Sequence, residues 1–276
     1  MLMPMDYLFS KGQNLNFWPR LGRLVGTKNE PFIIAIFFGK EDPETPVLLN
    51  EFAAEVRHLE NNGYNYNGVN YEFSIRYYIC DAPARAKMKC IIEHGGYFAC
   101  EKCEVEGEWI DNRMTYVDLE QPLRTDESFS NRAQEDHHNG RSPLDNTHWR
   151  PVSLFRLGKL HLVDLGAYKR LLCAWMKWNG PFKLTVPEIQ VISEAMEALV
   201  PSFPSDFNRK PRTLLEISRY AGTEFRRSLL YDGVLVFRDH LHENVYKNFL
   251  LLHSAMYILC SPEHYQNKNA LAHALL

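Results

Sequence analysis

The chain has 276 residues, and its 31 lysines and arginines against 34 aspartates and glutamates give a formal net charge of −3 at pH 7. A charge this small excludes strong bulk attraction to nucleic acid or anionic membranes. Hydrophobic residues make up 45% and charged residues 24% of the chain. This composition is typical of globular proteins and excludes a disordered, collagen-like or coiled-coil chain.

Neither a membrane span nor an export signal is expected. No apolar run approaches the ~20 residues that a membrane helix needs. Residues 1–10 lack the basic start and long apolar stretch of a signal peptide. Six cysteines do not make a disulfide framework in a chain of this length. We therefore expect an intracellular protein in a reducing compartment, without a membrane partner.

The first hundred residues have the pattern of an α/β domain. A short apolar run ends at Asp6, and the continuous apolar run 32–38 predicts a strand buried on both faces. Residues 47–60 predict an amphipathic helix, because their apolar side chains recur on one helical face. Strict alternation over 69–79 predicts one long strand that ends near Asp81, and a further helix is expected through Met88.

The remainder divides into a polar stretch and a helical half. Residues 104–150 are polar and weakly periodic, which indicates a long surface excursion, in part without fixed structure. Apolar periodicity then predicts helices over 162–178, 185–200, 214–230 and 245–259, the second of them opened by a capping box from Thr185 to Glu188. We expect an α/β core over 1–103, a polar excursion over 104–150 and a helical half over 151–276.

Asp6 and Asp81 each follow a predicted apolar strand. If the two strands are neighbours, the carboxylates meet at one sheet edge, where they can hold Mg²⁺ or Mn²⁺. The order strand–strand–strand–helix–strand, with acids after the first and fourth strands, is that of the ribonuclease-H-like core. The alternative is that each aspartate only ends a strand and begins a turn.

Cys100 and Cys103 form a C-x-x-C pair, a spacing that lets two thiolates bind one Zn²⁺ from a single tight turn. The alternative is a pair of unligated thiols. No second C-x-x-C exists, so histidines are the candidates for the other ligands: His94, His137, His138, His161 and His253. If they bind no metal, His137 and His138 are expected to be solvated residues of the polar stretch. His253 is then expected to be a core histidine whose hydrogen bonds are satisfied.

Further candidates are basic clusters and one glutamate. Arg85 and Lys87 follow Asp81, and a second cluster precedes a predicted helix, made of Arg209, Lys210 and Arg212. Such clusters can neutralise DNA phosphates, although a charge run is also compatible with a solvated face. Glu224 is a candidate third metal carboxylate, with a favourable position in the first turn of a helix as the alternative.

Several short segments resemble one protein family. The matching strings are NFWPRLG at 16–22, the apolar run with its flank at 32–40, ICDAPAR at 79–85, GGYFACEKC at 95–103, RTDESF at 124–129, LHLVDLG at 160–166, RKPR at 209–212 and TEFR at 223–226. In this order they are similar to the catalytic region of CACTA-type (En/Spm-like) DDE transposases, in the form of animal transposase domain-containing proteins. Gly158 departs from the family, which has aspartate there.

The resemblance implies a ribonuclease-H-like mixed sheet with a zinc-bearing, mostly α-helical insertion or back half. It implies metal-dependent DNA cleavage and strand transfer in the nucleus. DNA is the implied partner, and homo-oligomer formation is compatible with this activity. Asp6, Asp81 and Glu224 would be catalytic, with Mg²⁺ or Mn²⁺ on the two aspartates. Zn²⁺ would bind Cys100 and Cys103, with His161 as a further metal ligand. Relatives are expected to continue beyond Leu276, so the chain is expected to be a truncated or degenerate copy.

Two other hypotheses remain open. One is a transposase-derived DNA- or protein-binding protein that keeps the fold and zinc but lacks the chemistry, which the glycine at position 158 favours. The other is an unrelated metal-dependent nuclease with the same core, which would not carry family-specific strings such as the Asp-Ala-Pro-Ala at 81–84.

Overall fold

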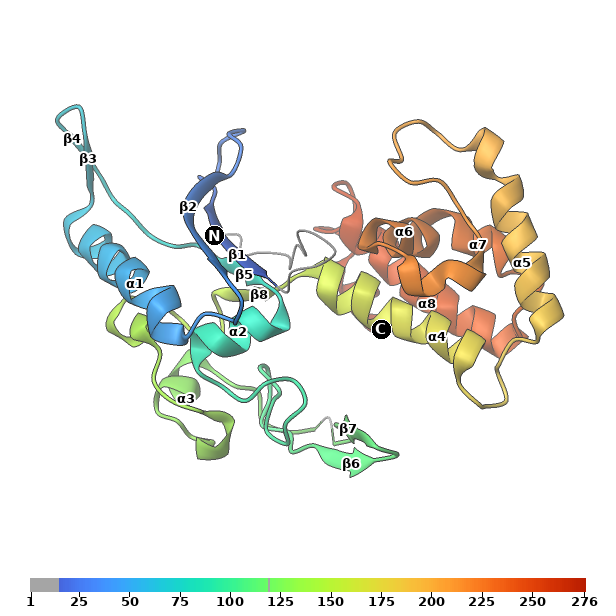
Figure 1. Ribbon diagram of the computed structural model, residues 1–276, viewed down its shortest axis with the longest axis horizontal. Helices are drawn as coiled ribbons and strands as arrows, with labels where there is room; N and C mark the ends of the chain where they lie inside the picture. Colours follow the sequence, from blue (N-terminus) through green and yellow to red (C-terminus); the bar gives the residue numbers. More distant parts are fainter. Residues whose placement is uncertain (1–14, 119) are drawn as a thin grey trace. The chain divides into compact units, whose positions relative to one another are not determined.

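The computed structural model describes residues 15–118 and 120–276, and the chain divides into two compact units (Figure 1). Unit 1 runs from Met1 to Gly158 and unit 2 from Lys159 to Leu276. The protein is mixed α/β, as predicted, with its described strands in unit 1. Asp6 and the apolar run before it lie outside the described residues. Within the described part, no helix is both long and apolar enough to cross a bilayer.

The described strands form small two-stranded sheets. β1 (Asn16–Gly22) pairs antiparallel with β2 (Phe32–Gly39), and β5 (Tyr78–Cys80) pairs parallel with β8 (Phe155–Leu157). Two hairpins, β3 (Tyr64–Tyr66) with β4 (Val69–Tyr71) and β6 (Glu108–Ile110) with β7 (Arg113–Thr115), complete the set. Because a parallel pair needs a long crossover, everything between Asp81 and Leu154 connects β5 to β8.

Helices α1 (Thr45–Asn62) and α2 (Ala82–Lys89) confirm the two helices predicted in this region. Each has a proline in its first turn, where the missing N–H costs nothing. Gly63 ends α1 with a φ of 71°, a conformation that suits glycine. The core of unit 1 lies where these helices meet the strands, and its largest buried members are Trp18, Leu49, Phe52, Val56, Tyr78, Met88 and Phe155.

Two strand predictions were wrong in part. The run 32–38 is a strand, but no residue of β2 is fully buried, and Ile33 and Phe38 are 64% and 59% exposed. The predicted strand 69–79 forms only at its ends, as β4 and β5, because β4 turns back to pair with β3. Phe73 and Ile75, between them, pack against the core as predicted. At the ends the predicted buried face was wrong, because Val69, Tyr71 and Ile79 are exposed and Tyr78 and Cys80 are the buried residues of β5.

The polar stretch 104–150 is part of unit 1, and it contains regular elements and buried side chains that its sequence pattern did not predict. It contains β6, β7, α3 (Asp126–Ser130) and two 3₁₀ turns, η1 (Glu135–His137) and η2 (Pro143–Asn146). Phe129, His137 and Leu144 are buried. Their burial was not visible as periodicity because the buried side chains are separated by short irregular segments.

Unit 2 is helical, as predicted, although several helices are broken into shorter pieces. Its longer helices are α4 (Lys169–Lys177), α5 (Val186–Ala198) and α8 (Glu243–Cys260). The capping box from Thr185 to Glu188 is present at the start of α5. The shorter pieces are the π-helical segments η3 (Leu160–Tyr168) and η6 (Ser228–Asp232), the 3₁₀ segments η4 (Val200–Ser202) and η5 (Leu214–Arg219), and α6 (Gly222–Arg227), α7 (Gly233–Val236) and α9 (Asn269–Leu275).

Unit 2 closes around one hydrophobic cluster, in which Phe249 packs against the rings of Tyr168, Trp175 and Phe237. The two π-helical segments are joined by a buried hydrogen bond of 2.8 Å between the Tyr168 and Ser228 hydroxyls. His253 bonds through Nδ1 to the carbonyl of Leu229, inside η6. It thus satisfies a backbone group in a segment where the regular α-helical hydrogen bonding is interrupted.

Candidate metal-binding site

Asp81 lies at the carboxyl end of β5 and begins α2. Its Oδ1 accepts a hydrogen bond of 2.9 Å from the backbone N–H of Ala84, which caps the helix. The residue is 9% exposed. Its other carboxylate oxygen, Oδ2, forms no hydrogen bond with any residue that the structure describes. The aspartate therefore fills the capping role of the alternative hypothesis, and Oδ2 has no hydrogen-bond partner among the described residues.

The basic residues after Asp81 are engaged within unit 1. Arg85 is buried and donates from Nη1 to the carbonyl of Cys80 at 2.7 Å. Lys87 donates to the carbonyl of Pro43 at 2.8 Å and lies over the Trp18 ring. These contacts hold α2 in place, and Arg85 is also ion-paired with Glu101, whereas Lys87 has no carboxylate partner among the described residues.

Cys100 and Cys103 lie on one tight turn. Their sulfur atoms are 3.3 Å apart, and the N–H of Cys103 points to the sulfur of Cys100 at 3.4 Å. Two sulfurs this close can both lie about 2.3 Å from one zinc ion. Burial, and then the neighbouring Cys100, raise the pKa of Cys103. Burial therefore favours the thiol form of Cys103.

Glu101, between the two cysteines, connects this turn to helix α2. Its carboxylate accepts from Arg85 Nε and from Lys89 Nζ, both at 2.7 Å. Burial alone would raise the pKa of Glu101, but the two cations hold it below its ordinary value. Lys89 also lies 4.5 Å from the centre of the Phe155 ring on β8. One carboxylate thus ties the cysteine turn to the helix that begins at Asp81.

The candidate histidines do not complete a zinc site in the described chain. His94 is exposed, and His137 is buried with its Nδ1 bonded to the carbonyl of Phe98 at 2.6 Å. His161 and His253 belong to unit 2. Over 15–118 and 120–276, no group of three or more His, Cys, Asp or Glu side chains is placed to hold a metal ion. Two thiols are therefore the ligands that the described residues bring together.

Glu224, the predicted third carboxylate, belongs to unit 2 and is fully engaged there. It accepts from Arg212 Nε and from the N–H of Ala221, both at 2.8 Å, and from Arg209 Nη1 at 3.4 Å. Its side chain is 2% exposed. These contacts explain its burial without a metal ion. Arg212 is an internal partner, whereas Arg209 and Lys210 remain on the surface.

The sequence analysis missed Glu101 and Arg124. Arg124 donates from Nε to the carbonyl of Cys100 at 2.9 Å and from its guanidinium to the side chain of Gln134. Both residues lie in segments, 95–103 and 124–129, that contributed only to the family resemblance. The sequence did contain a signal for the ion pairs of Glu101, because a glutamate inside the C-x-x-C turn follows a helix rich in basic residues.

Comparisons with known proteins add no assignment. No family model, no curated protein and no solved structure matches the chain.

Proposed function

We propose that this chain is the catalytic region of a DDE-transposase-like protein, acting in the nucleus on DNA phosphodiester bonds. The observation that carries the proposal is Asp81: it follows a strand of a parallel pair, and one of its carboxylate oxygens has no hydrogen-bond partner among the described residues. A carboxylate oxygen is the ligand that Mg²⁺ and Mn²⁺ prefer. Asp6, outside the described residues, is the second proposed ligand.

The pairing of the described strands supports a ribonuclease-H-like core. An antiparallel pair, β1 with β2, is followed by α1, by the β3–β4 hairpin and then by β5, which pairs parallel with β8. Apart from the hairpin, this is the order of elements that the core requires after its first strand. The ribonuclease-H-like assignment of this mixed α/β unit is itself part of the proposal.

The described residues have distinct tasks in this function. Asp81 would hold the cation, and the Glu101 ion pairs would fix α2 and with it the direction of the Asp81 carboxylate. Cys100 and Cys103 would supply two thiolates for a structural Zn²⁺. A bound Mg²⁺ or Mn²⁺ would supply polarisation of water or of a DNA 3′-hydroxyl and stabilisation of the leaving oxygen.

The test is metal-dependent nicking and strand transfer with Asp81→Asn. Asparagine caps helices as well as aspartate does, so the fold should be kept while the rate falls by ~10³-fold or more. Asp111→Asn is the matched control, because Asp111 is exposed in the β6–β7 turn at a φ of 49°, which asparagine also adopts. An Asp81→Asn variant as active as the unaltered protein would disprove the assignment.

The zinc proposal is tested separately by metal analysis. We expect about one zinc ion per chain, since two thiolates from one turn commonly form half of a structural site, and we expect Cys103→Ser to lose it. Finding no zinc, or the same zinc content in the variant, would remove this part of the proposal.

A second candidate function is DNA or protein binding without chemistry. The arginine partners of Glu224 favour it, because a DDE site needs a third carboxylate and this one is occupied. Inactivity of the unaltered protein with both Mg²⁺ and Mn²⁺, together with retained DNA binding, would select this candidate.

A further inference from the structure

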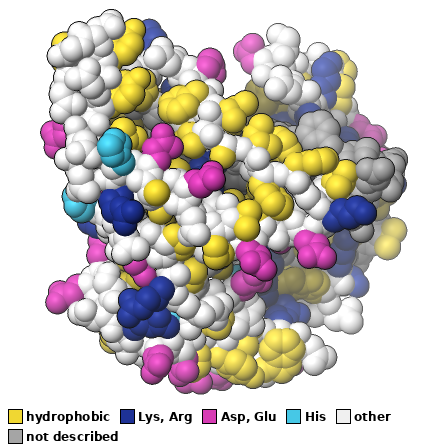
Figure 2. Space-filling model, turned by 60° about the vertical axis from the view of Figure 1, so that its left-hand side comes forward, with side chains coloured by type: hydrophobic (Ala, Val, Ile, Leu, Met, Phe, Trp, Pro, Cys, Tyr) yellow, Lys and Arg dark blue, Asp and Glu magenta, His cyan; other side chains and the backbone are white. Residues whose placement is uncertain are grey.

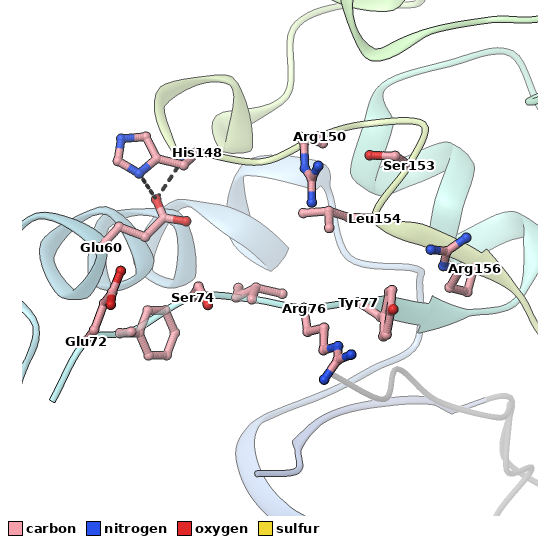
Figure 3. A pocket seen from close by; sticks show the side chains of 12 residues that line it. Glu60, Glu72, Ser74, Arg76, Tyr77, His148, Arg150, Ser153, Leu154 and Arg156 are labelled. Carbon is pink, nitrogen blue, oxygen red and sulfur yellow. Dashed lines mark hydrogen bonds and ion pairs between the residues drawn. The ribbon is translucent and has the colours of Figure 1, made fainter. Parts of the chain in front are cut away.

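A cavity of about 630 Å³ opens in unit 1 at a distance from Asp81 (Figure 3). One wall is the extended segment 72–77, which leads into β5, and the other is the segment 148–156, which leads into β8. β5 separates the cavity from Asp81, because Tyr77 precedes the strand and Asp81 follows it. Four residues of extended chain span ~13 Å, so this is a separate site.

The two ends of the cavity carry opposite charges. Glu60 and Glu72 lie at one end, where Glu60 accepts from the backbone N–H of His148 at 2.8 Å. Arg76, Arg150 and Arg156 lie toward the other end, around Tyr77, as Figure 3 shows. An anion is therefore directed to the arginine end.

Strand alternation places Tyr77 and Arg156 on the outer face of the β5–β8 pair. Tyr78 and Phe155 point into the core, so Tyr77 and Arg156, their neighbours in sequence, point to the opposite face. The Arg156 guanidinium lies 4.8 Å and that of Arg76 5.7 Å from the centre of the Tyr77 ring. Hydrogen bonds from both arginines lower the pKa of Tyr77. Two guanidinium groups thus lie beside one aromatic ring.

The three arginines have charge to spare. None of them lies within 4.0 Å of a carboxylate oxygen in the described part of the chain. Arg150 lowers the pKa of Asp126 from a distance. Asp126 itself is bonded to the N–H groups of Val152 and Ser153 and to the Ser153 hydroxyl. Asp126 thus accepts hydrogen bonds from the loop and forms no ion pair with the three arginines.

We propose that the Arg76, Arg150 and Arg156 end of this cavity binds the phosphodiester backbone of a nucleic-acid strand. Guanidinium groups match phosphate oxygens with paired N–H donors. The Tyr77 ring between two of them is the aromatic surface on which a base or sugar packs in single-strand sites. The cavity lies in the size range of small-ligand sites, which suits a few nucleotides of one strand rather than a whole duplex.

The proposal goes beyond strand transfer and does not depend on it. Because no catalytic metal takes part, binding is measured without added Mg²⁺ or Mn²⁺ and without a chelator, so that a structural zinc is kept. Strand transfer by Asp81→Asn tests the catalytic proposal, and DNA binding by Arg76→Ala and Arg156→Ala tests this one. Failure of the catalytic proposal and failure of this one are therefore separate results.

The experiment is fluorescence anisotropy with a labelled 12-nucleotide single-stranded DNA at low salt. Arg76→Ala and Arg156→Ala should each weaken binding about tenfold, the loss expected for one charge-assisted phosphate contact. Each should also reduce the slope of affinity against salt concentration by about one phosphate contact. Arg156→Lys, which keeps the charge but not the paired donors, should lose less. Arg57→Ala is the matched control, because Arg57 is exposed on α1 and does not line the cavity.

A competition experiment distinguishes binding of a nucleic-acid strand from binding of free phosphate. Inorganic phosphate at millimolar concentration should displace the strand poorly, because it offers one phosphate where the strand offers several. Equal losses in Arg57→Ala and the cavity variants would show only bulk attraction and would overturn the proposal. So would unchanged binding in both cavity variants. Displacement by phosphate as efficient as by unlabelled strand would reassign the cavity to the free anion.

Discussion

The two units bury their hydrophobic residues to different degrees. In unit 2, aromatic and aliphatic side chains from α4, α5, α8 and the π-helical segments close into one cluster. In unit 1 the core is split into two smaller clusters, and the outer face of β2 stays exposed at Phe32, Ile33, Ile36 and Phe38. In Figure 2, hydrophobic side chains, drawn in yellow, are visible at the surface of the face that is turned forward.

The difference follows from how the two kinds of element satisfy their backbones. A helix closes its hydrogen bonds internally, so an amphipathic helix needs only a partner for one face. A strand needs neighbours in the sheet as well as cover for its faces. The described part of unit 1 gives β2 one neighbour, β1, and one covered face, through Ile34 and Phe37. Strand stability therefore depends on more distant parts of the chain than helix stability does.

The largest effect is expected from the core of unit 2. Phe249→Ala removes a fully buried ring that contacts Tyr168, Trp175 and Phe237. Such a change costs about 3–5 kcal/mol, through lost burial and the cavity that remains. Denaturant unfolding followed by hydrogen exchange should show the loss in unit 2 peptides. An equal loss of protection in unit 1 would show that the units do not unfold separately and would break the comparison.

Acid should affect the units differently. Burial lowers the pKa of His137 in unit 1 to about 4, whereas an unfolded histidine has a pKa of about 6.5. The unfolded state therefore binds more protons between these values, so the stability contributed by neutral His137 is complete above pH 6.5 and is lost as the pH falls toward 4. The loss is at most about 3 kcal/mol.

In unit 2, burial raises the pKa of Asp164 and Asp232. The folded state therefore binds protons more readily than the unfolded state at these carboxyls, so their contribution to the stability of unit 2 rises as the pH falls. Unfolding of unit 1 should thus become easier between pH 6.5 and 4 relative to unit 2. His137→Gln should reduce the pH dependence of unit 1 and leave the part due to His138, whose pKa burial also lowers to about 4. A variant that keeps the full dependence would mean that other groups cause it.

Two of the three predicted site carboxylates, Asp81 and Glu224, sharpen the comparison further. Glu224→Gln should destabilise unit 2 by about 2 kcal/mol, because it removes a charged acceptor from Arg212 and leaves that arginine underbonded. Asp81→Asn should cost less than about 0.5 kcal/mol, since both residues cap α2 equally well. Urea midpoints of the two variants provide the measurement. Equal losses would show that Asp81 also has a structural role beyond capping.

The sequence predicted the helices better than the sheets for the same physical reason. The period of α1 and the capping box of α5 are local signals, and both are present in the structure. The partner of each strand is not a local property, and 69–79 was divided between β4 and β5 because a turn at Asn67 and Gly68, both with positive φ, pairs β4 with β3. The contacts at the site were harder still, because Glu101 meets Arg85 and Lys89 only after α2 and the cysteine turn have come together.

The smallest effect is expected at the exposed face of β2. Phe38→Ala should change the free energy of unfolding by less than about 0.5 kcal/mol, because the side chain is 59% exposed. Phe37→Ala is the matched control, since Phe37 packs against the unit 1 core, and it should cost several times more. A loss at Phe38 as large as at Phe37 would mean that the outer face of β2 is covered in solution. The difference between the units would then lie in what covers each core, not in how much apolar surface each one buries.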